Sequence, residues 1–367
     1  MIKRSFSLTV FMIFTVSVFS QIDDSKLFTK KYIKEVTQKA THWQLNHPKH
    51  DPKDWTNGAF YAGVVAAWET TGSKDIYAAL LELGNSQNWK PYNRWYHADD
   101  IAISQTYIDV YKKEKKAYMI QPTIDTVDIF LSRKYPTGGK VDIIKWWWCD
   151  ALFMGPPTLV KLAKVTGKQM YLDSSDRYFR ETYDLLYNKE EKLFARDLNY
   201  VIKPDGSGRK EANGRKIFWS RGNGWVMGGL VRILQELPED HPQRPFYENL
   251  LKEMAGRVAQ LQQEDGLWRA SLLAPENYPG GEVSGSGFFC YALAWGINNK
   301  LLDANVFLPV VKKTWIALTK CVNDEGRVGW VQPIGASPNK NFNADSWEVY
   351  GTGAFLLAAN EVIKLKR

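Results

Sequence analysis

Two aspartates that directly precede apolar segments are the residues of this sequence best suited to acid–base chemistry. Asp150 follows three consecutive tryptophans and is itself followed by Ala-Leu-Phe-Met. Asp100 belongs to the segment His97-Ala-Asp-Asp-Ile-Ala, in which we expect Asp99 to cap a helix and to leave Asp100 free to face the mouth of the site. Paired carboxyl groups on either side of a sugar bond are the usual apparatus of glycoside hydrolysis. The two aspartates are therefore the candidate catalytic pair.

Both aspartates also have a structural interpretation as helix N-caps, a role in which Asp accepts from free backbone N–H groups and contributes about 1 kcal/mol. The tryptophans before Asp150, and Pro156-Pro157, which delays regular helix, favour a functional role for that residue. A carboxyl group in an aromatic, poorly hydrated pocket keeps its proton to higher pH and is suited to general acid catalysis. We expect Asp150 to be that acid.

A third cluster, Trp219-Ser-Arg-Gly-Asn-Gly-Trp225, combines aromatic rings with one arginine. The guanidinium of Arg221 is suited to a planar two-bond contact with a carboxylate, and Trp219 and Trp225 are suited to walling a sugar ring. The alternative is a glycine turn that contains a structural arginine.

Helical segments of two kinds alternate along the chain and must position these residues. Some are apolar all round and rich in Gly and Ala, which predicts burial on every side, and amphipathic segments with one charged face lie between them. The apolar segments are 58–68, 223–230, 286–295 and 351–359, with two more that begin at Asp100 and Asp150; amphipathic examples are 28–45, 119–133 and 245–263. Six of each kind predict an all-α double ring of helices, an (α/α)6 barrel that forms one domain over residues 21–367.

Each apolar segment follows a loop that is rich in Trp, Asn, Asp, Gly or Pro. If the six inner helices run in the same direction, these loops gather at one end of the barrel. That end is the candidate active site.

The first 20 residues read as a secretory signal peptide. Lys3 and Arg4 precede an apolar stretch that is too short to span a membrane, and small residues stand before Gln21. We therefore expect a periplasmic or secreted protein whose mature chain does not insert into the membrane. The odd count of three cysteines excludes a disulfide framework, and the absence of Cys-x-x-Cys together with five scattered histidines argues against a zinc site.

The charge and the aromatic content together point to an anionic partner with flat faces. The formal net charge is +8, but the lysines are spread along the chain and form none of the concentrated basic stripes that nucleic-acid binding requires. With 15 Trp and 18 Tyr, the chain is suited to stacking against acidic sugars, although most of these rings must fill the core. We expect an acidic oligosaccharide as partner.

The motifs jointly resemble those of the unsaturated uronyl hydrolases of glycoside hydrolase families 88 and 105, above all the rhamnogalacturonyl hydrolases of family 105. The resemblance extends from about Trp55 to the C-terminus. It rests on Trp-Thr-Asn-Gly-Ala-Phe (55–60), His-Ala-Asp-Asp-Ile-Ala (97–102), Trp-Trp-Cys-Asp-Ala-Leu-Phe-Met (147–154), Trp-Ser-Arg-Gly-Asn-Gly-Trp (219–225), Glu-Val-Ser-Gly-Ser (282–286) and Tyr-Gly-Thr-Gly-Ala-Phe (350–355).

This resemblance implies an (α/α)6 barrel that hydrates the C4=C5 double bond of a terminal unsaturated uronic acid, with Asp150 as general acid and base and Asp100 as the second carboxylate. No metal or organic cofactor is expected. Protonation on carbon activates an enol ether, so one well-placed acid can do most of this work. The residues that we assign to substrate contact are Trp55, Asn57, His97, Trp148, Trp219, Arg221 and Trp225.

One segment departs from the family pattern. Several rhamnogalacturonyl enzymes carry a histidine before the aspartate that matches Asp197, where this chain has Phe194 and Arg196. An unsaturated galacturonyl residue on rhamnose, from pectin, is the first expectation for the substrate, and an unsaturated glucuronyl residue from ulvan is the second. The rival functions are a polysaccharide lyase, with His97 as the only histidine in the motif loops, and a non-catalytic protein that binds acidic sugars.

Overall fold

Helical hairpins follow one another along the computed structural model, which describes residues 24–133 and 145–366. The first helix of each hairpin lies outside: α1 (Lys30–Asn46), α3 (Lys74–Ser86), α5 (Gln121–Ser132), α8 (Gln169–Leu186), α10 (Arg244–Gln260) and α12 (Ala304–Lys320). The second lies inside: α2 (Trp55–Thr71), α4 (Ser104–Glu114), the one-turn α6 (Ala151–Met154) continued by α7 (Pro156–Thr166), α9 (Ser220–Leu234), α11 (Val283–Asn298) and α13 (Val349–Val362).

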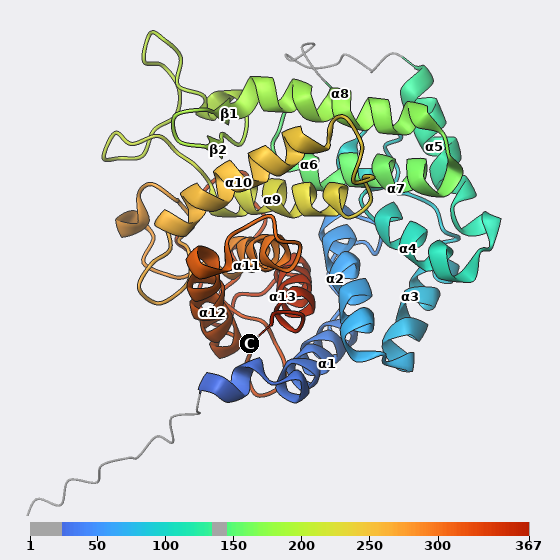
Figure 1. The fold of residues 1–367 in the computed structure, drawn as a ribbon, viewed down its shortest axis with the longest axis horizontal. Helices are drawn as coiled ribbons and strands as arrows, with labels where there is room; N and C mark the ends of the chain where they lie inside the picture. Colours follow the sequence, from blue (N-terminus) through green and yellow to red (C-terminus); the bar gives the residue numbers. More distant parts are fainter. Residues whose placement is uncertain (1–23, 134–144, 367) are drawn as a thin grey trace, which may run out of the picture.

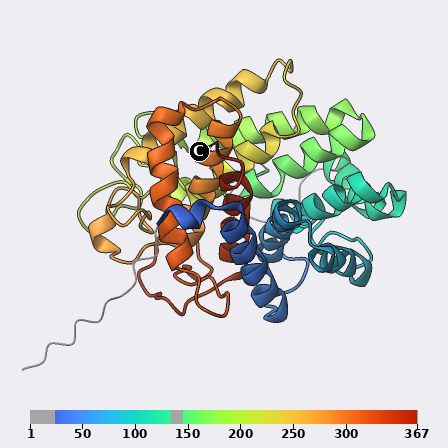
Figure 2. The same ribbon diagram turned by 60° about the horizontal axis from the view of Figure 1, so that its bottom comes forward.

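The inner helices form a closed ring. Contacts join α2 to α4, α4 to α7, α7 to α9, α9 to α11 and α11 to α13, and α13 returns to α2. The colours in Figure 1 follow the same path around the molecule, so that the red α13 lies beside the blue α2. The turned view in Figure 2 shows α1 against this junction. The expected all-α (α/α)6 barrel is confirmed.

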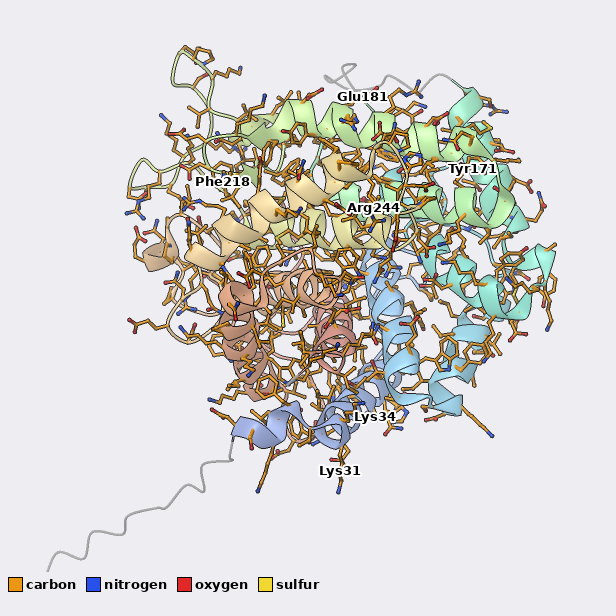
Figure 3. The ribbon with its side chains drawn as sticks, in the orientation of Figure 1. Lys31, Lys34, Tyr171, Glu181, Phe218 and Arg244 are labelled. Atoms are coloured by element: carbon orange, nitrogen blue, oxygen red, sulfur yellow. The ribbon has the colours of Figure 1, made fainter. Side chains whose placement is uncertain are left out.

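Amino-acid composition explains which helix lies in which ring. The inner helices α2 and α13 meet where a Cβ added to Gly63 would lie 2.6 Å from the carbonyl oxygen of Gly353, so glycine is required for this close approach. The outer helix α1 buries Ile33 and turns Lys31 and Lys34 away from the barrel (Figure 3). The alternation of fully apolar and amphipathic segments is thus an alternation of inner and outer helices.

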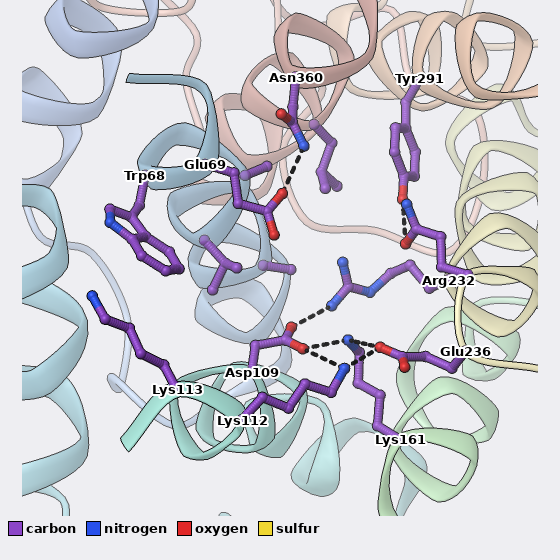
Figure 4. Close-up of a pocket in the computed structure, with 15 residues that line it drawn as sticks. Trp68, Glu69, Asp109, Lys112, Lys113, Lys161, Arg232, Glu236, Tyr291 and Asn360 are labelled. Atoms are coloured by element: carbon purple, nitrogen blue, oxygen red, sulfur yellow. Dashed lines mark hydrogen bonds and ion pairs between the residues drawn. The ribbon is translucent and has the colours of Figure 1, made fainter. Parts of the chain in front are cut away.

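At one end of the barrel, the last turns of the inner helices surround an open cavity of about 480 Å³. Lys161 of α7 places its Nζ 2.6 Å from Asp109 Oδ1 of α4 and 3.0 Å from Oε1 of Glu236, which follows α9 (Figure 4). Lys112 contacts both carboxylates, and Arg232 Nη2 lies 3.6 Å from Asp109 Oδ2. This network ties together three successive inner helices.

The loops before the inner helices gather at the opposite end, called the mouth below. Trp55, at the start of α2, stacks on Tyr350 at the start of α13 with ring centroids 5.4 Å apart, and its centroid lies 6.0 Å from that of Trp225 in α9. A short antiparallel hairpin, β1 (Tyr187–Asn188) and β2 (Leu193–Phe194), lies between α8 and α9. Single 3-10 turns complete the described structure: η1 (Asp24–Phe28), η2 (Ala98–Ile101), η3 (Ala117–Met119), η4 (Leu198–Tyr200) and η5 (Pro275–Asn277).

The expected signal peptide, residues 1–20, lies outside the described residues. Within the described ranges, no helix combines the length and the apolar character that crossing a bilayer requires. Cys149, Cys290 and Cys321 are all free thiols, and the first two are buried.

Candidate active site

Asp150 stands at the N-cap position of α6, but its side chain makes no capping hydrogen bond. The carboxylate, 14% exposed, is therefore available for other contacts. A backbone hydrogen bond anchors the loop that carries Asp150, because the N–H of Cys149 donates to the carbonyl oxygen of Arg196 at 2.9 Å. The helix-cap interpretation of Asp150 thus does not describe what its carboxylate does.

Arg196 is the charged partner of Asp150. Its Nε lies 3.4 Å from Asp150 Oδ2, while its Nη1 donates to Asp197 Oδ2 at 2.8 Å. Asp197 is held in turn by the backbone N–H and the side-chain amide of Asn199, which both donate to its Oδ1. Burial alone would lower the pKa of Arg196, but the carboxylates of Asp150 and Asp197 raise it, so this side chain is a fixed cation.

The segment that carries Arg196 is positioned by α9. Asn223, which is fully buried, accepts from Phe194 N at 2.8 Å and donates to Phe194 O at 3.1 Å, so one side chain acts as a partner strand for β2. Gly222 faces the Asp150 loop, since a Cβ added there would lie 3.2 Å from Cys149 Sγ and 3.1 Å from the Trp219 ring. The glycines and the asparagine of the Trp219–Trp225 motif therefore position the Asp150 loop and Arg196.

The structure corrects the expected roles of Asp99 and Asp100. The cap of η2 is His97, whose Nδ1 accepts from Asp99 N at 3.3 Å. Asp100 is 1% exposed and accepts from three donors of Arg94, the backbone N at 2.6 Å, Nε at 3.0 Å and Nη2 at 2.5 Å. Asp100 does not face the mouth as a free carboxylate, because its hydrogen bonds with Arg94 hold the loop in place.

Asp99 is the carboxyl group that interacts with Asp150. Burial and, second, the negative charge of Asp150 raise the pKa of Asp99 to about 7. Its Oδ1 is buried and has no hydrogen-bond partner among the described residues. The negative charge of Asp150 thus favours the protonated form of Asp99.

His97 and Trp148 line the same side of the mouth. Their ring centroids are 4.7 Å apart, and Trp148 is 4% exposed. Burial, followed by the charge of Arg94, lowers the pKa of His97 to about 4. His97 is therefore a neutral imidazole near pH 7, with its proton on Nε2 because Nδ1 accepts a hydrogen bond.

Trp55 and Asn57 occupy the first turn of α2. Trp55 is partly exposed and stacks on Tyr350, so its ring is placed to meet a sugar. The side-chain amide of Asn57 donates to the carbonyl oxygens of Lys49 and Asp51, each at 2.9 Å. Asn57 holds a loop, and these two bonds use both of its donor hydrogens.

The structure places Trp219, Arg221 and Trp225 below the surface rather than on it. Arg221 is fully buried, and its Nη1 and Nη2 donate to the carbonyl oxygens of Gln332 at 2.6 Å and Pro333 at 3.0 Å. Its guanidinium also lies over the Trp219 ring. The expected open contact between Arg221 and a substrate carboxylate is not present, because loop carbonyls far along the chain take its donors.

Several buried polar atoms of these motifs have no hydrogen-bond partner among the described residues: Asp99 Oδ1, Arg196 Nε, Arg221 Nε and Trp225 Nε1. Buried polar groups are normally satisfied, so such atoms mark where water or a ligand is bound. In the described ranges, no group of three His, Cys, Asp or Glu side chains is arranged to hold a metal ion. The arrangement can supply two carboxyl groups, one cation and aromatic walls, which suits proton transfer to an acidic sugar.

Sequence reasoning missed the roles of three residues. Arg196 was visible only as a departure from a family pattern, and nothing in its neighbourhood signalled a contact with Asp150. Asn223 was part of a recognised motif, but its partner Phe194 lies 29 residues away. Gln332 accepts from Trp219 Nε1 through Oε1, and from both Arg221 and Tyr350 through its backbone oxygen, and no motif pointed to it.

Comparisons with known proteins show what this chain is similar to. Residues 27–366 match the family described as Glycosyl Hydrolase Family 88. The chain is 51% identical to a protein of Formosa agariphila named "Unsaturated 3S-rhamnoglycuronyl hydrolase", over 89% of each chain. A solved structure described as a glycosyl hydrolase of family 88 from Bacteroides vulgatus is 30% identical, with a TM-score of 0.83 over 92% of this chain and all of that one. Another, named as a polysaccharide lyase, is 32% identical with a TM-score of 0.83, over 91% of this chain and 97% of that one.

Proposed function

Since the chain belongs to glycosyl hydrolase family 88, and is a glycoside hydrolase, we propose that Asp150 and Asp99 at the mouth carry out its hydration chemistry. The activity is removal of a 4,5-unsaturated uronic acid from the non-reducing end of an oligosaccharide. The observation that carries the proposal is the Asp150 carboxylate, which makes no capping bond, lies 3.4 Å from Arg196 Nε and raises the pKa of Asp99 through its charge.

The reaction adds one water across the C4=C5 bond of the uronyl ring. A carboxylic acid gives its proton to C4, which leaves an oxocarbenium ion at C5. A carboxylate then takes a proton from the water that attacks C5. The hemiketal that results opens and releases the remaining oligosaccharide as the leaving alcohol. One acid and one base are therefore sufficient.

The pair of Asp99 and Asp150 meets this requirement. One proton must be available at the site, and the negative charge of Asp150 favours its retention on Asp99. The raised pKa of Asp99, to about 7, keeps that proton available near neutrality. We assign proton transfer at C4 to Asp150, with Asp99 as the second carboxyl group. Asp100 positions the loop through Arg94, a different role from the one expected for it.

We propose that the substrate carries rhamnose next to the unsaturated uronyl group. The support is the name of the Formosa agariphila relative, a rhamnoglycuronyl hydrolase that is 51% identical. Of the two expected sources, this favours ulvan fragments over pectin fragments. Trp55, which is partly exposed, supplies flat apolar surface for a sugar ring.

The test of the function uses the ultraviolet absorbance of the conjugated double bond. Lyase-generated disaccharides with a glucuronyl or a galacturonyl end are each mixed with the purified protein. Absorbance should fall, and fall faster with the glucuronyl end. An Asp150→Asn variant should fold like the wild type and lose at least about 10²-fold in kcat, as expected for loss of an acid–base group. Retained activity in this variant would move the acid role to another residue.

The second candidate function is a polysaccharide lyase, which the similarity to the structure named as a polysaccharide lyase favours. The same assay distinguishes the two functions. A lyase creates the double bond, so absorbance would rise on intact polymer. In that case His97 is the candidate base, since its pKa of about 4 leaves it neutral near pH 7. No change with any unsaturated uronide would remove the hydrolase proposal.

We further propose that the protein is exported, on the strength of the apolar segment behind Lys3 and Arg4. The test is to measure the mass of the protein recovered from the periplasm and from the medium of the producing cells. Export with cleavage should give a chain that begins near Gln21, and a full-length chain in the cytoplasm would contradict it.

A further inference from the structure

Three arginines of the motif loops are candidates to receive the carboxylate of an acidic sugar, and two of them are already occupied. Arg221 is fully buried and donates to two backbone carbonyls. Arg94 is 45% exposed, but its Nε and Nη2 both donate to Asp100. Arg196 differs, because it is 20% exposed, its Nη1 alone donates a hydrogen bond to another described side chain, and its Nε is held near Asp150 by an ion pair.

The surroundings of Arg196 hold its side chain in one position and leave it accessible. Asp197 fixes Nη1, Asn199 fixes Asp197, and Asn223 fixes the backbone two residues earlier. The guanidinium lies 5.8 Å from the centroid of the Trp147 ring and is 20% exposed, so it is confined but reachable. A rigid guanidinium with an unsatisfied donor recognises a planar carboxylate well.

We propose that Arg196 binds the carboxylate of the uronyl substrate and, by exchanging Asp150 for that carboxylate, frees Asp150 to take up the proton that it delivers to C4. This rests on the proposed function and names the residue that couples substrate charge to catalysis. Arg196 touches the substrate in this role and also determines which of the two aspartates is charged.

The charges around Asp150 explain how the exchange works. Arg196, on the segment after β2, forms an ion pair with Asp150, and the Cys149 thiol lies 3.7 Å from Asp150 Oδ2. Asp99, on η2, interacts with the charges of Asp150, Arg94, Asp100 and Arg196. Without substrate the Arg196 cation lies 3.4 Å from Asp150 Oδ2, and the pKa of Asp99 is raised to about 7, so Asp99 holds a proton below that pH. When a substrate carboxylate takes over Arg196, Asp150 loses its partner and gains a nearby negative charge. Both changes favour protonated Asp150.

A neutral analogue separates carboxylate binding from every other role of Arg196. The wild type and an Arg196→Gln variant are each assayed with an unsaturated disaccharide as the free acid and as its methyl ester. The wild type should prefer the acid by on the order of 10- to 100-fold in kcat/KM, the usual effect of one charge-assisted hydrogen-bonded contact. The variant should lose this preference, with most of the loss on the acid.

Arg209→Gln is the matched control, since Arg209 is exposed on the neighbouring loop and donates to the Tyr200 hydroxyl. It should keep the acid preference. Arg196→Lys keeps the charge but cannot serve Asp197 and a carboxylate together, so its preference should be intermediate. This variant replaces Arg196→Gln if the latter does not fold.

The pH profile is the second readout. Loss of the Arg196 cation removes a positive charge that stabilises carboxylates at the site, so the acidic limb of kcat/KM should move upward. Equal losses on acid and ester, or an unchanged preference, would overturn the role of Arg196 while leaving the hydrolase assignment intact. A wild type that consumes neither compound would instead remove the proposed function.

Discussion

The raised pKa of Asp99 predicts a specific dependence of stability on pH. Asp99→Asn replaces the carboxyl group with a neutral group of the same shape, which imitates the protonated form. The pKa of Asp99 is raised from 3.8 to about 7 in the folded protein, by burial first and by Asp150 second. The folded state therefore binds this proton more tightly than the unfolded state does.

The sign and size of the effect follow from linkage. Below pH 4 the proton is bound in both states, and Asp99 contributes its full stabilisation. As pH rises toward 7, only the unfolded state releases the proton, so that contribution is lost. A shift of three pH units corresponds to about 4 kcal/mol. The side chain is 18% exposed, so solvent screening reduces this only in part.

The assay is urea unfolding of wild type and Asp99→Asn at a series of pH values from 4 to 8. The difference in unfolding free energy should move in favour of the variant by about 3 to 4 kcal/mol across this range and then level off. Asp324→Asn, at an exposed turn, should show no such trend. A difference that stays constant within 1 kcal/mol between pH 5 and pH 8 would refute the reasoning.

Two further substitutions test what positions the site and closes the barrel. Asn223→Ala leaves the backbone N–H and carbonyl of Phe194 buried without their partner. The variant should lose about 3 kcal/mol of unfolding free energy in urea, and its kcat should fall because Arg196 is no longer held in place. Asn213→Ala, on the exposed surface, should cost under about 0.5 kcal/mol. Lys161→Met removes a buried cation from Asp109 and Glu236 and should cost about 3 to 5 kcal/mol of unfolding free energy at pH 7. Lys164 is 55% exposed and 3.7 Å from Glu236, so Lys164→Met should cost under about 1 kcal/mol. Similar losses for the two lysines would contradict the network.

The repeat pattern predicted the fold because helices buried on all sides are apolar all round, whereas helices buried on one side are amphipathic. The two kinds of segment became the inner and outer rings, and the break expected at Pro156 appears as α6 followed by α7. The pattern located the start of α4 less well. Asp100 was expected at its beginning, but it belongs to η2, and α4 begins at Ser104.

The details of the site were beyond sequence because they depend on contacts between distant segments. Which of two adjacent aspartates is buried depends on where Arg94 folds back, and a shift of one residue in this turn exchanges their roles. The position of Arg221 depends on carbonyl groups 111 and 112 residues further along the chain. Local pattern contains no information about such partners, and even for Asp150, which stands out in the sequence, the charged partner Arg196 lies on a distant segment.

The parallel direction of the inner helices gives the barrel an electrical axis. Each α-helix carries a partial positive charge at its N-terminus and a partial negative charge at its C-terminus. With the inner helices aligned, the positive ends converge on the mouth and the negative ends on the cavity that holds Lys112, Lys161 and Arg232. The lysines and the arginine offset the converging negative ends, and the positive ends at the mouth attract an anionic sugar from solution. Capture of the substrate should therefore slow as salt is added.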